Sequence, residues 1–173
     1  MQRLFTRSSI NSLAHLTRRN IRIEARLKER GITLGEPVPP KGNYVSAVRS
    51  GNSLFLAGHI PLMPDGTLAK GKVGMDVTPE EANKIARQIA INIITSLKTE
   101  LGDLDKVKRI VKLVGFVNCV DGFGGQPGVI NGASDLMCEV FGEKGVHARS
   151  AVGTNALPLN IPVEIEAIVE IEN

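Results

Sequence analysis

Two stretches of the chain repeat apolar residues at three- and four-residue steps, the period of an amphipathic helix. The first is preceded by Thr78-Pro79-Glu80-Glu81, which offers an N-cap hydroxyl, a proline at the first helical position and the glutamate of a capping box. Its apolar stripe extends over Ala82–Leu97, and Gly102 provides a stop. The second stretch covers about Pro127–Phe141 and ends at Gly142. The pattern therefore predicts two long helices.

Other stretches have the pattern of β-strands. Val163–Ile171 alternates between Val, Ile or Ala on one face and mostly Glu on the other. Ile110–Val120 is β-branched and apolar with little alternation, which predicts a strand covered on both faces. Tyr44–Arg49 and Leu54–Ala57 flank Gly51-Asn52, a pair suited to a tight hairpin turn. This order of elements predicts an α+β fold, a mixed sheet with both long helices on one face.

The composition divides the chain into three regions. Residues 1–22 hold five arginines, several Ser and Thr and no acidic residue, which is typical of a mitochondrial transit peptide. A basic arm that binds a partner is the alternative interpretation. Residues 23–43 contain a short charged helix, ended by Gly31, and a proline-rich linker. We expect residues 44–173 to form the folded domain.

The distribution of charge and apolar residues limits the possible partners. The net charge of the chain is +3, but without the five leader arginines 16 basic residues face 18 acidic ones, a net charge of −2. A slightly acidic body gives no electrostatic footprint for nucleic acid. No apolar run approaches the roughly 20 residues that a membrane span needs.

The cysteines and histidines do not indicate a metal site. Cys119 and Cys138 lie in no CxxC pair, and we interpret both as small buried residues. The three histidines are dispersed, without the spacing of metal ligands. We therefore expect no metal site.

Two residues are candidates for chemistry on the sheet face away from the helices. Glu164 belongs to the polar side of the last strand, and we expect Arg149, in His147-Ala148-Arg149-Ser150-Ala151, to share that face. An arginine fork in a partly closed site suits bidentate binding of a carboxylate. The alternative is a surface or inter-subunit salt bridge, and the residues alone do not decide between the two.

Several short motifs resemble the RidA (YjgF) family from Gly42 to the C-terminus. Gly42-Asn43-Tyr44-Val45 is similar to the family's opening motif, and Ala57-Gly58-His59-Ile60-Pro61 to its first strand end. The closing signature has three parts, Ala148–Val152, Leu157-Pro158 and Val163–Glu166. The longer Gly-Gly-Gln-Pro loop and the segment from Val129 to Asp135 resemble a bacterial-type branch of this family.

The resemblance implies a chorismate-mutase-like fold and a homotrimer with clefts between subunits. The implied activity is hydrolysis of reactive 2-imino acids or enamines to 2-keto acids and ammonia, without a cofactor. By position, Arg149 would bind the substrate carboxylate and Glu164 would orient the attacking water. Tyr44 would line the cleft and Asn131 would lie near its mouth. Backbone groups at two further positions, Gly58 and Ala151, would supply hydrogen bonds.

The chain departs from the family pattern at three positions of the implied cleft. The family's serine is Ala57, its glutamine is His59, and a cysteine that is often found after the arginine is Ala151. Three functions therefore stay open: an imine or enamine deaminase of the mitochondrial matrix, a non-catalytic trimer that binds a ligand or belongs to a larger mitochondrial assembly, and an endoribonuclease.

Overall fold

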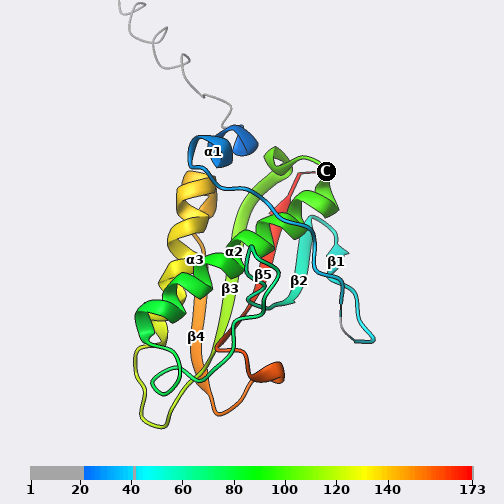
Figure 1. The fold of residues 1–173 in the computed structure, drawn as a ribbon. Coiled ribbons are helices and arrows are strands. Elements are labelled where there is room, and N and C mark those ends of the chain that lie inside the picture. The colour runs from blue at the N-terminus through cyan, green and yellow to red at the C-terminus, as the bar shows by residue number, and fades with distance from the viewer. Residues whose placement is uncertain (1–21, 41, 173) are drawn as a thin grey trace, which may run out of the picture.

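Five strands form one mixed sheet, and the long helices cover one of its faces (Figure 1). The structure is a computed structural model that describes residues 22–40 and 42–172. Across the sheet the order is β1-β2-β5-β3-β4, and every pair is antiparallel except β3 with β4. The predicted α+β fold is confirmed. The strands are β1 (Ala47–Ser50), β2 (Ser53–His59), β3 (Val107–Asn118), β4 (Ala148–Thr154) and β5 (Val163–Ile171).

The helices begin and end close to where the sequence predicts. Helix α2 (Pro79–Leu101) has the capping box of Thr78 and Glu81, and Gly102 ends it in the left-handed conformation. Helix α3 (Gln126–Phe141) follows the glycine-rich loop. The short charged helix is α1 (Ile23–Glu29). Single 3-10 turns cover Leu104–Lys106, Gly142–Gly145 and Pro158–Asn160.

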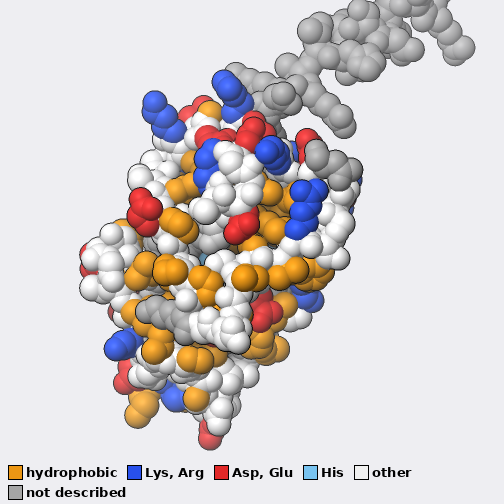
Figure 2. Space-filling model, turned by 90° about the vertical axis from the view of Figure 1, so that its right-hand side faces the viewer, with side chains coloured by type: hydrophobic (Ala, Val, Ile, Leu, Met, Phe, Trp, Pro, Cys, Tyr) orange, Lys and Arg blue, Asp and Glu red, His pale blue; other side chains and the backbone are white. Residues whose placement is uncertain are grey.

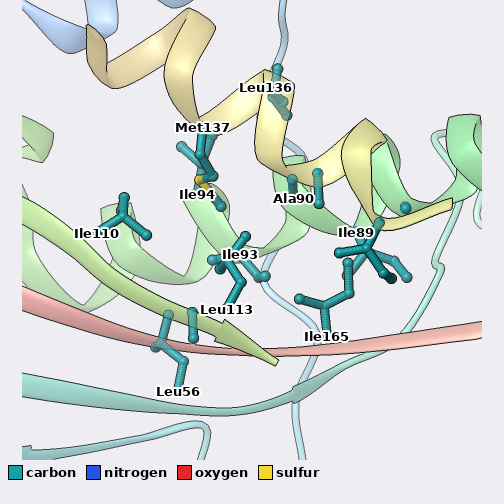
Figure 3. Close-up of a cluster of buried hydrophobic side chains, with 14 of the residues drawn as sticks. Leu56, Ile89, Ala90, Ile93, Ile94, Ile110, Leu113, Leu136, Met137 and Ile165 are labelled. Atoms are coloured by element: carbon teal, nitrogen blue, oxygen red, sulfur yellow. The ribbon is translucent and has the colours of Figure 1, made fainter. Parts of the chain in front are cut away.

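The hydrophobic core lies between the two long helices and the sheet face beneath them (Figure 3). Ile89 and Ile93 of α2, Met137 of α3, Leu113 of β3 and Ile165 of β5 are completely buried. Aliphatic side chains fill almost all of this layer, as the scarcity of aromatic residues requires. Burial of such side chains contributes about 1.5–3 kcal/mol each, so this layer is the main source of stability.

The other sheet face is not covered by residues 22–40 or 42–172. The pairing of strands places Val48, Phe55, Ile168 and Lys112 in one row across this face. Phe55 is 44% exposed and Val48 is 54% exposed. Figure 2 views the β1 side of the molecule, where hydrophobic side chains form a broad band. The prediction that the β3 stretch is covered on both faces is therefore wrong for the described part of a single chain, because Val111 is 38% exposed and Val114 and Phe116 are only half-buried.

Helix α1 is fixed to the body by hydrogen bonds to two acidic side chains, one in the body and one in the helix itself. Asp105 accepts a hydrogen bond from the Ile23 N–H, and Glu24 accepts from Lys98 Nζ, both at 2.8 Å. The predicted leader, residues 1–22, lies outside the described residues except for Arg22. Within the described part of the chain, no helix is both long and apolar enough to cross a bilayer.

Candidate functional site

A pocket of about 350 Å³ opens where β2 ends beside the start of β5. Glu164 and Tyr44 lie on its wall together with the backbone of Gly58, so the structure brings three of the predicted site residues together. Most of the remaining lining is apolar and includes the proline-rich segment before β1. These other lining residues are Val38, Pro39, Pro40, Ser46, Ala57, His59, Ile60, Asn92, Pro158 and Leu159.

Glu164 is half-buried in this pocket, and no described residue places a cation beside it. Among residues 22–40 and 42–172, no hydrogen bond or ion pair reaches its carboxylate, and its only charged influence is Glu166. Burial raises the pKa of Glu164 above its ordinary value, and the neighbouring Glu166 carboxylate raises it further. Proton affinity above that of an ordinary carboxylate suits a group that accepts a proton from a reacting water.

Gly58 leaves room for this carboxylate. The pairing of β2 with β5 is interrupted between Leu56 and His59, so the strand bulges at Gly58. A methyl group on Gly58 would collide with Oε1 of Glu164. The backbone of Gly58 and the carboxylate are therefore packed against each other, which only glycine permits at this position.

His59 fixes the bulge and is neutral. Its Nδ1 lies 2.7 Å from the Ala57 carbonyl, which can only accept, so Nδ1 carries the proton. Its Nε2 is 2.8 Å from Ser96 Oγ and accepts the hydroxyl proton. Burial lowers the pKa of His59, although the Ala57 carbonyl opposes this effect. His59 therefore acts as a fixed brace between the bulge and α2.

A polar row on α2 supports the same end of β2, and the sequence analysis did not identify it. Asn92 Nδ2 donates to the carbonyls of Ile60 and Leu62, both at 3.1 Å, and Asn92 Oδ1 accepts from Gln88. Residues 88, 92 and 96 recur at four-residue steps beside the apolar stripe of the helix. This four-residue spacing is the signal from which the row could have been predicted, because polar side chains next to a buried stripe need hydrogen-bond partners.

Arg149 lies elsewhere, at the β4 edge of the sheet. It pairs with Leu113, whose side chain is buried beneath the helices, so Arg149 is on the helix-facing side. Its Nη1 donates to Asn131 Oδ1 at 2.8 Å and to Ser134 Oγ at 3.0 Å, both on α3. The expectation that Arg149 shares the open face with Glu164 is wrong. Ala151 pairs with Gly115 on the same helix-facing side, beside Arg149.

The predicted site residues thus form two separate half-sites in one chain. Tyr44, Gly58 and Glu164 make up the pocket half-site, and Arg149, Asn131 and Ala151 make up the edge half-site. Glu164 pairs with Phe116, three positions along β3 from the partner of Arg149. This offset corresponds to about 10 Å along the strand and about 10 Å across two strand spacings, with the side chains on opposite faces. One small substrate cannot contact both groups of a single chain.

The remaining reactive side chains belong to neither half-site. Cys119 is buried as predicted, but Cys138 is exposed, so the interpretation of both cysteines as buried is wrong. Among the described residues, Glu24, Asp103 and Asp105 lie close enough to hold a metal ion. Each of these carboxylates already accepts a backbone or lysine hydrogen bond that fixes α1 or the turn at residues 104–106.

Comparison with known protein families matches residues 24–170 to the family described as "YjgF/chorismate_mutase-like, putative endoribonuclease". Protein TCP17 of Trypanosoma cruzi is 44% identical over 153 residues, which cover 88% of this chain and 96% of that protein. The crystal structure of Atu1372 from Agrobacterium tumefaciens is similar with a TM-score of 0.80 and 47% identity, over 88% of this chain and 96% of the other.

Two further relatives have names that bear on activity and location. A Dermatophagoides farinae protein named 2-iminobutanoate/2-iminopropanoate deaminase is 33% identical over 135 residues, 77% of this chain and 89% of that protein. Protein MMF1 of Saccharomyces cerevisiae, named as mitochondrial, is 27% identical over 150 residues, 83% and 90% of the two chains. The fold, the extent of the family match and these relatives agree: the chain belongs to the YjgF/RidA family.

Proposed function

We propose that the protein hydrolyses reactive 2-imino acids or enamines to 2-keto acids and ammonia, at sites formed between copies of the chain. The observation that carries the proposal is the separation of the two half-sites. One half-site holds a proton acceptor in an apolar pocket, and the other holds a guanidinium group that can bind a carboxylate. The described pocket half-site contains no group that binds a carboxylate, and the edge half-site contains no proton acceptor for water.

Glu164 has the properties that this reaction needs from a base. Its carboxylate would accept a proton from a water molecule as the water oxygen bonds to the imine carbon. The proton would then pass to the nitrogen and give a carbinolamine; transfer of the carbinolamine's hydroxyl proton to the nitrogen would break the C–N bond, release ammonia and leave a keto group. Because an imine carbon is already electrophilic, most of the catalysis would come from position and orientation. Such chemistry needs no cofactor.

Arg149 has the properties that carboxylate binding needs. Nη1 is the nitrogen that contacts α3, and among the described residues Nε and Nη2 have no acceptor. An Nε–Nη2 edge presents two parallel N–H groups, the geometry of a bidentate contact with a carboxylate. Tyr44, which is 54% exposed, would cover the substrate from the pocket half-site.

The exposed sheet face provides a reason for the copies to associate. A shallow hollow of about 360 Å³ lies over it, with Val48, Phe55, Val114 and Ile168 in its lining. Apolar side chains gathered on one face are typical of a protein interface. A closed ring of three copies, with the β4 edge of each copy beside the pocket of the next, would create three complete sites. The trimer is part of the proposal.

The pocket lining favours a substrate with an apolar side chain. Val38, Pro39 and Ile60 face the space next to Glu164, and among the described residues of the lining Glu164 is the only one with a charge. A second charge on the substrate would be desolvated without a partner there, which is costly. Imines of small or branched aliphatic amino acids therefore fit better than imines of acidic or basic ones.

The location proposed for this activity is the mitochondrial matrix. The support is the arginine-rich, acid-free composition of residues 1–22 together with the mitochondrial name of the yeast relative. A larger mitochondrial assembly is a further possible partner of the trimer.

The direct test is the rate of 2-keto acid formation from freshly generated 2-iminopropanoate, above the spontaneous rate. We expect acceleration by the wild-type protein and none by Glu164→Gln. An inactive wild-type trimer that still binds a 2-keto acid would favour the non-catalytic ligand-binding alternative. The body charge of −2 gives no support to an endoribonuclease activity.

A further inference from the structure

Arg149 is held by a chain of hydrogen bonds that reaches back to its own strand. Its Nη1 donates to Asn131 and Ser134, which are three positions apart on α3 and therefore share one helix face. Ser134 Oγ is also 3.0 Å from Nε2 of His147, which lies two residues before Arg149. His147 Nδ1 is 2.6 Å from the carbonyl of Gly145.

In this hydrogen-bond network, the groups that can only accept determine which atoms donate. A backbone carbonyl can only accept, so Nδ1 of His147 carries the proton and donates it to Gly145. In the neutral imidazole, Nε2 then has a lone pair and accepts the Ser134 hydroxyl proton. The Ser134 oxygen is left with its lone pairs, one of which accepts from Arg149. With a neutral imidazole, Ser134 therefore receives from Arg149 and donates to His147.

We propose that Ser134 and His147 are positioning residues for Arg149. Together with Asn131 they occupy Nη1 and leave the Nε–Nη2 edge available for a carboxylate. This inference rests on the proposed function, because it assigns a purpose to the orientation of the guanidinium group. It goes beyond the proposed function in giving roles to Ser134 and His147, neither of which contacts the substrate in that account.

The location of the network supports positioning over a role in folding. Ser134, His147 and Arg149 are half-buried and Asn131 is exposed, and none of the four belongs to the hydrophobic core. Loss of the Ser134 hydroxyl therefore leaves no cavity in the core. What it removes is an acceptor for Arg149 and the donor to His147. The guanidinium group would then be free to rotate away from the edge.

The experiment compares Ser134→Ala with Ser134→Thr, which keeps the hydroxyl group. Binding of 2-oxobutanoate, a stable 2-keto acid, would be measured by titration, with kcat and KM for the imine. We expect Ser134→Ala to weaken binding and raise KM roughly tenfold, with a smaller change in kcat, and Ser134→Thr to restore binding to near the wild-type value. The matched control is Asp135→Asn, an exposed neighbour on α3, which should bind like the wild type.

Nitrogen NMR of His147 tests the network without reference to activity. We expect Nδ1 to carry the proton in the wild type and in Ser134→Ala, because the Gly145 carbonyl is present in both, and we expect the Nε2 resonance to shift in Ser134→Ala, where its contact with the Ser134 hydroxyl is lost. An Nε2-protonated wild type, or a Ser134→Ala variant that binds 2-oxobutanoate as tightly as the wild type, would overturn the inference. If the wild type does not bind any 2-keto acid but His147 has the expected tautomer, the proposed function fails and the network stands.

Discussion

Arg149 and Glu164 lie on opposite faces of one sheet, three positions apart along the strand β3 with which both pair. Each is in a setting suited to its proposed role. Arg149 is held at one nitrogen by α3, and Glu164 is half-buried against a glycine. Their separation within the chain is the geometric fact that makes quaternary structure part of the proposed activity.

Replacement of Arg149 by lysine should abolish most of the activity although the positive charge is kept. An ammonium group cannot form the two parallel hydrogen bonds of the guanidinium edge, and the loss should cost about 1.5–3 kcal/mol, or at least a tenfold fall in kcat/KM. Steady-state kinetics with the imine measures this directly. A kcat/KM within a factor of two of the wild type would remove Arg149 from the site.

The acid limb of the pH–activity profile should lie above the ordinary glutamate range. Glu164 must be ionised to accept a proton, so activity should fall as the pH drops through its raised pKa. Glu166→Gln removes the second cause of that raised value, and the limb should move to lower pH. An acid limb at or below pH 4.5 in the wild type, or a limb that Glu166→Gln leaves in place, would argue against Glu164 as the base.

Gly58→Ala should inactivate the enzyme without unfolding it. The added methyl group would displace the Glu164 carboxylate, which is the flexible end of a side chain and can move. We expect a fall in kcat of at least tenfold and a Tm within a few degrees of the wild type. Gly124→Ala is a control for the substitution itself, since Gly124 does not have a positive φ and its added methyl group would touch no other described part of the molecule. Full activity of Gly58→Ala would mean that the carboxylate position is not important.

Removal of residues 1–22 should leave the Tm nearly unchanged and should move a tagged protein out of mitochondria. Helix α1 starts at Ile23, which is buried and bound to Asp105, so this truncation retains the docked helix. A truncation that also removes α1 is the matched control. It exposes the core that Ile23 and Leu27 cover, and it should lower the Tm clearly. A large fall in Tm with the shorter truncation would make the leader part of the fold.

The local features of this fold could be read from the sequence because they are determined by nearby residues. The capping box at Thr78, the stop at Gly102 and the alternation of Val163–Ile171 each predicted an element that the structure contains. The face on which Arg149 lies could not be predicted in this way. It depends on how β4 pairs with β3, a parallel pair whose register is set by packing of the intervening α3.

The residues of the candidate site could be predicted from local motifs, but their arrangement in space could not. Motifs identified the six residues, but their division into two half-sites depends on the strand order, which no local pattern encodes. The apolar character of β3 was predicted correctly, but the prediction that both of its faces are covered was wrong for a single chain. The described residues of one chain leave the side chains on its open face uncovered, and a second copy of the chain is the cover that the proposed trimer supplies.

The most direct test of the central claim is complementation between two inactive variants. Arg149→Lys and Glu164→Gln would be co-expressed with different tags, and mixed oligomers would be isolated through both tags. If each site takes Glu164 from one copy and Arg149 from its neighbour, every mixed trimer isolated through both tags has one complete site, so activity should return to about one third of the wild-type value. Each variant alone should be inactive. Mixed oligomers that are as inactive as the parent variants would contradict a site shared between copies.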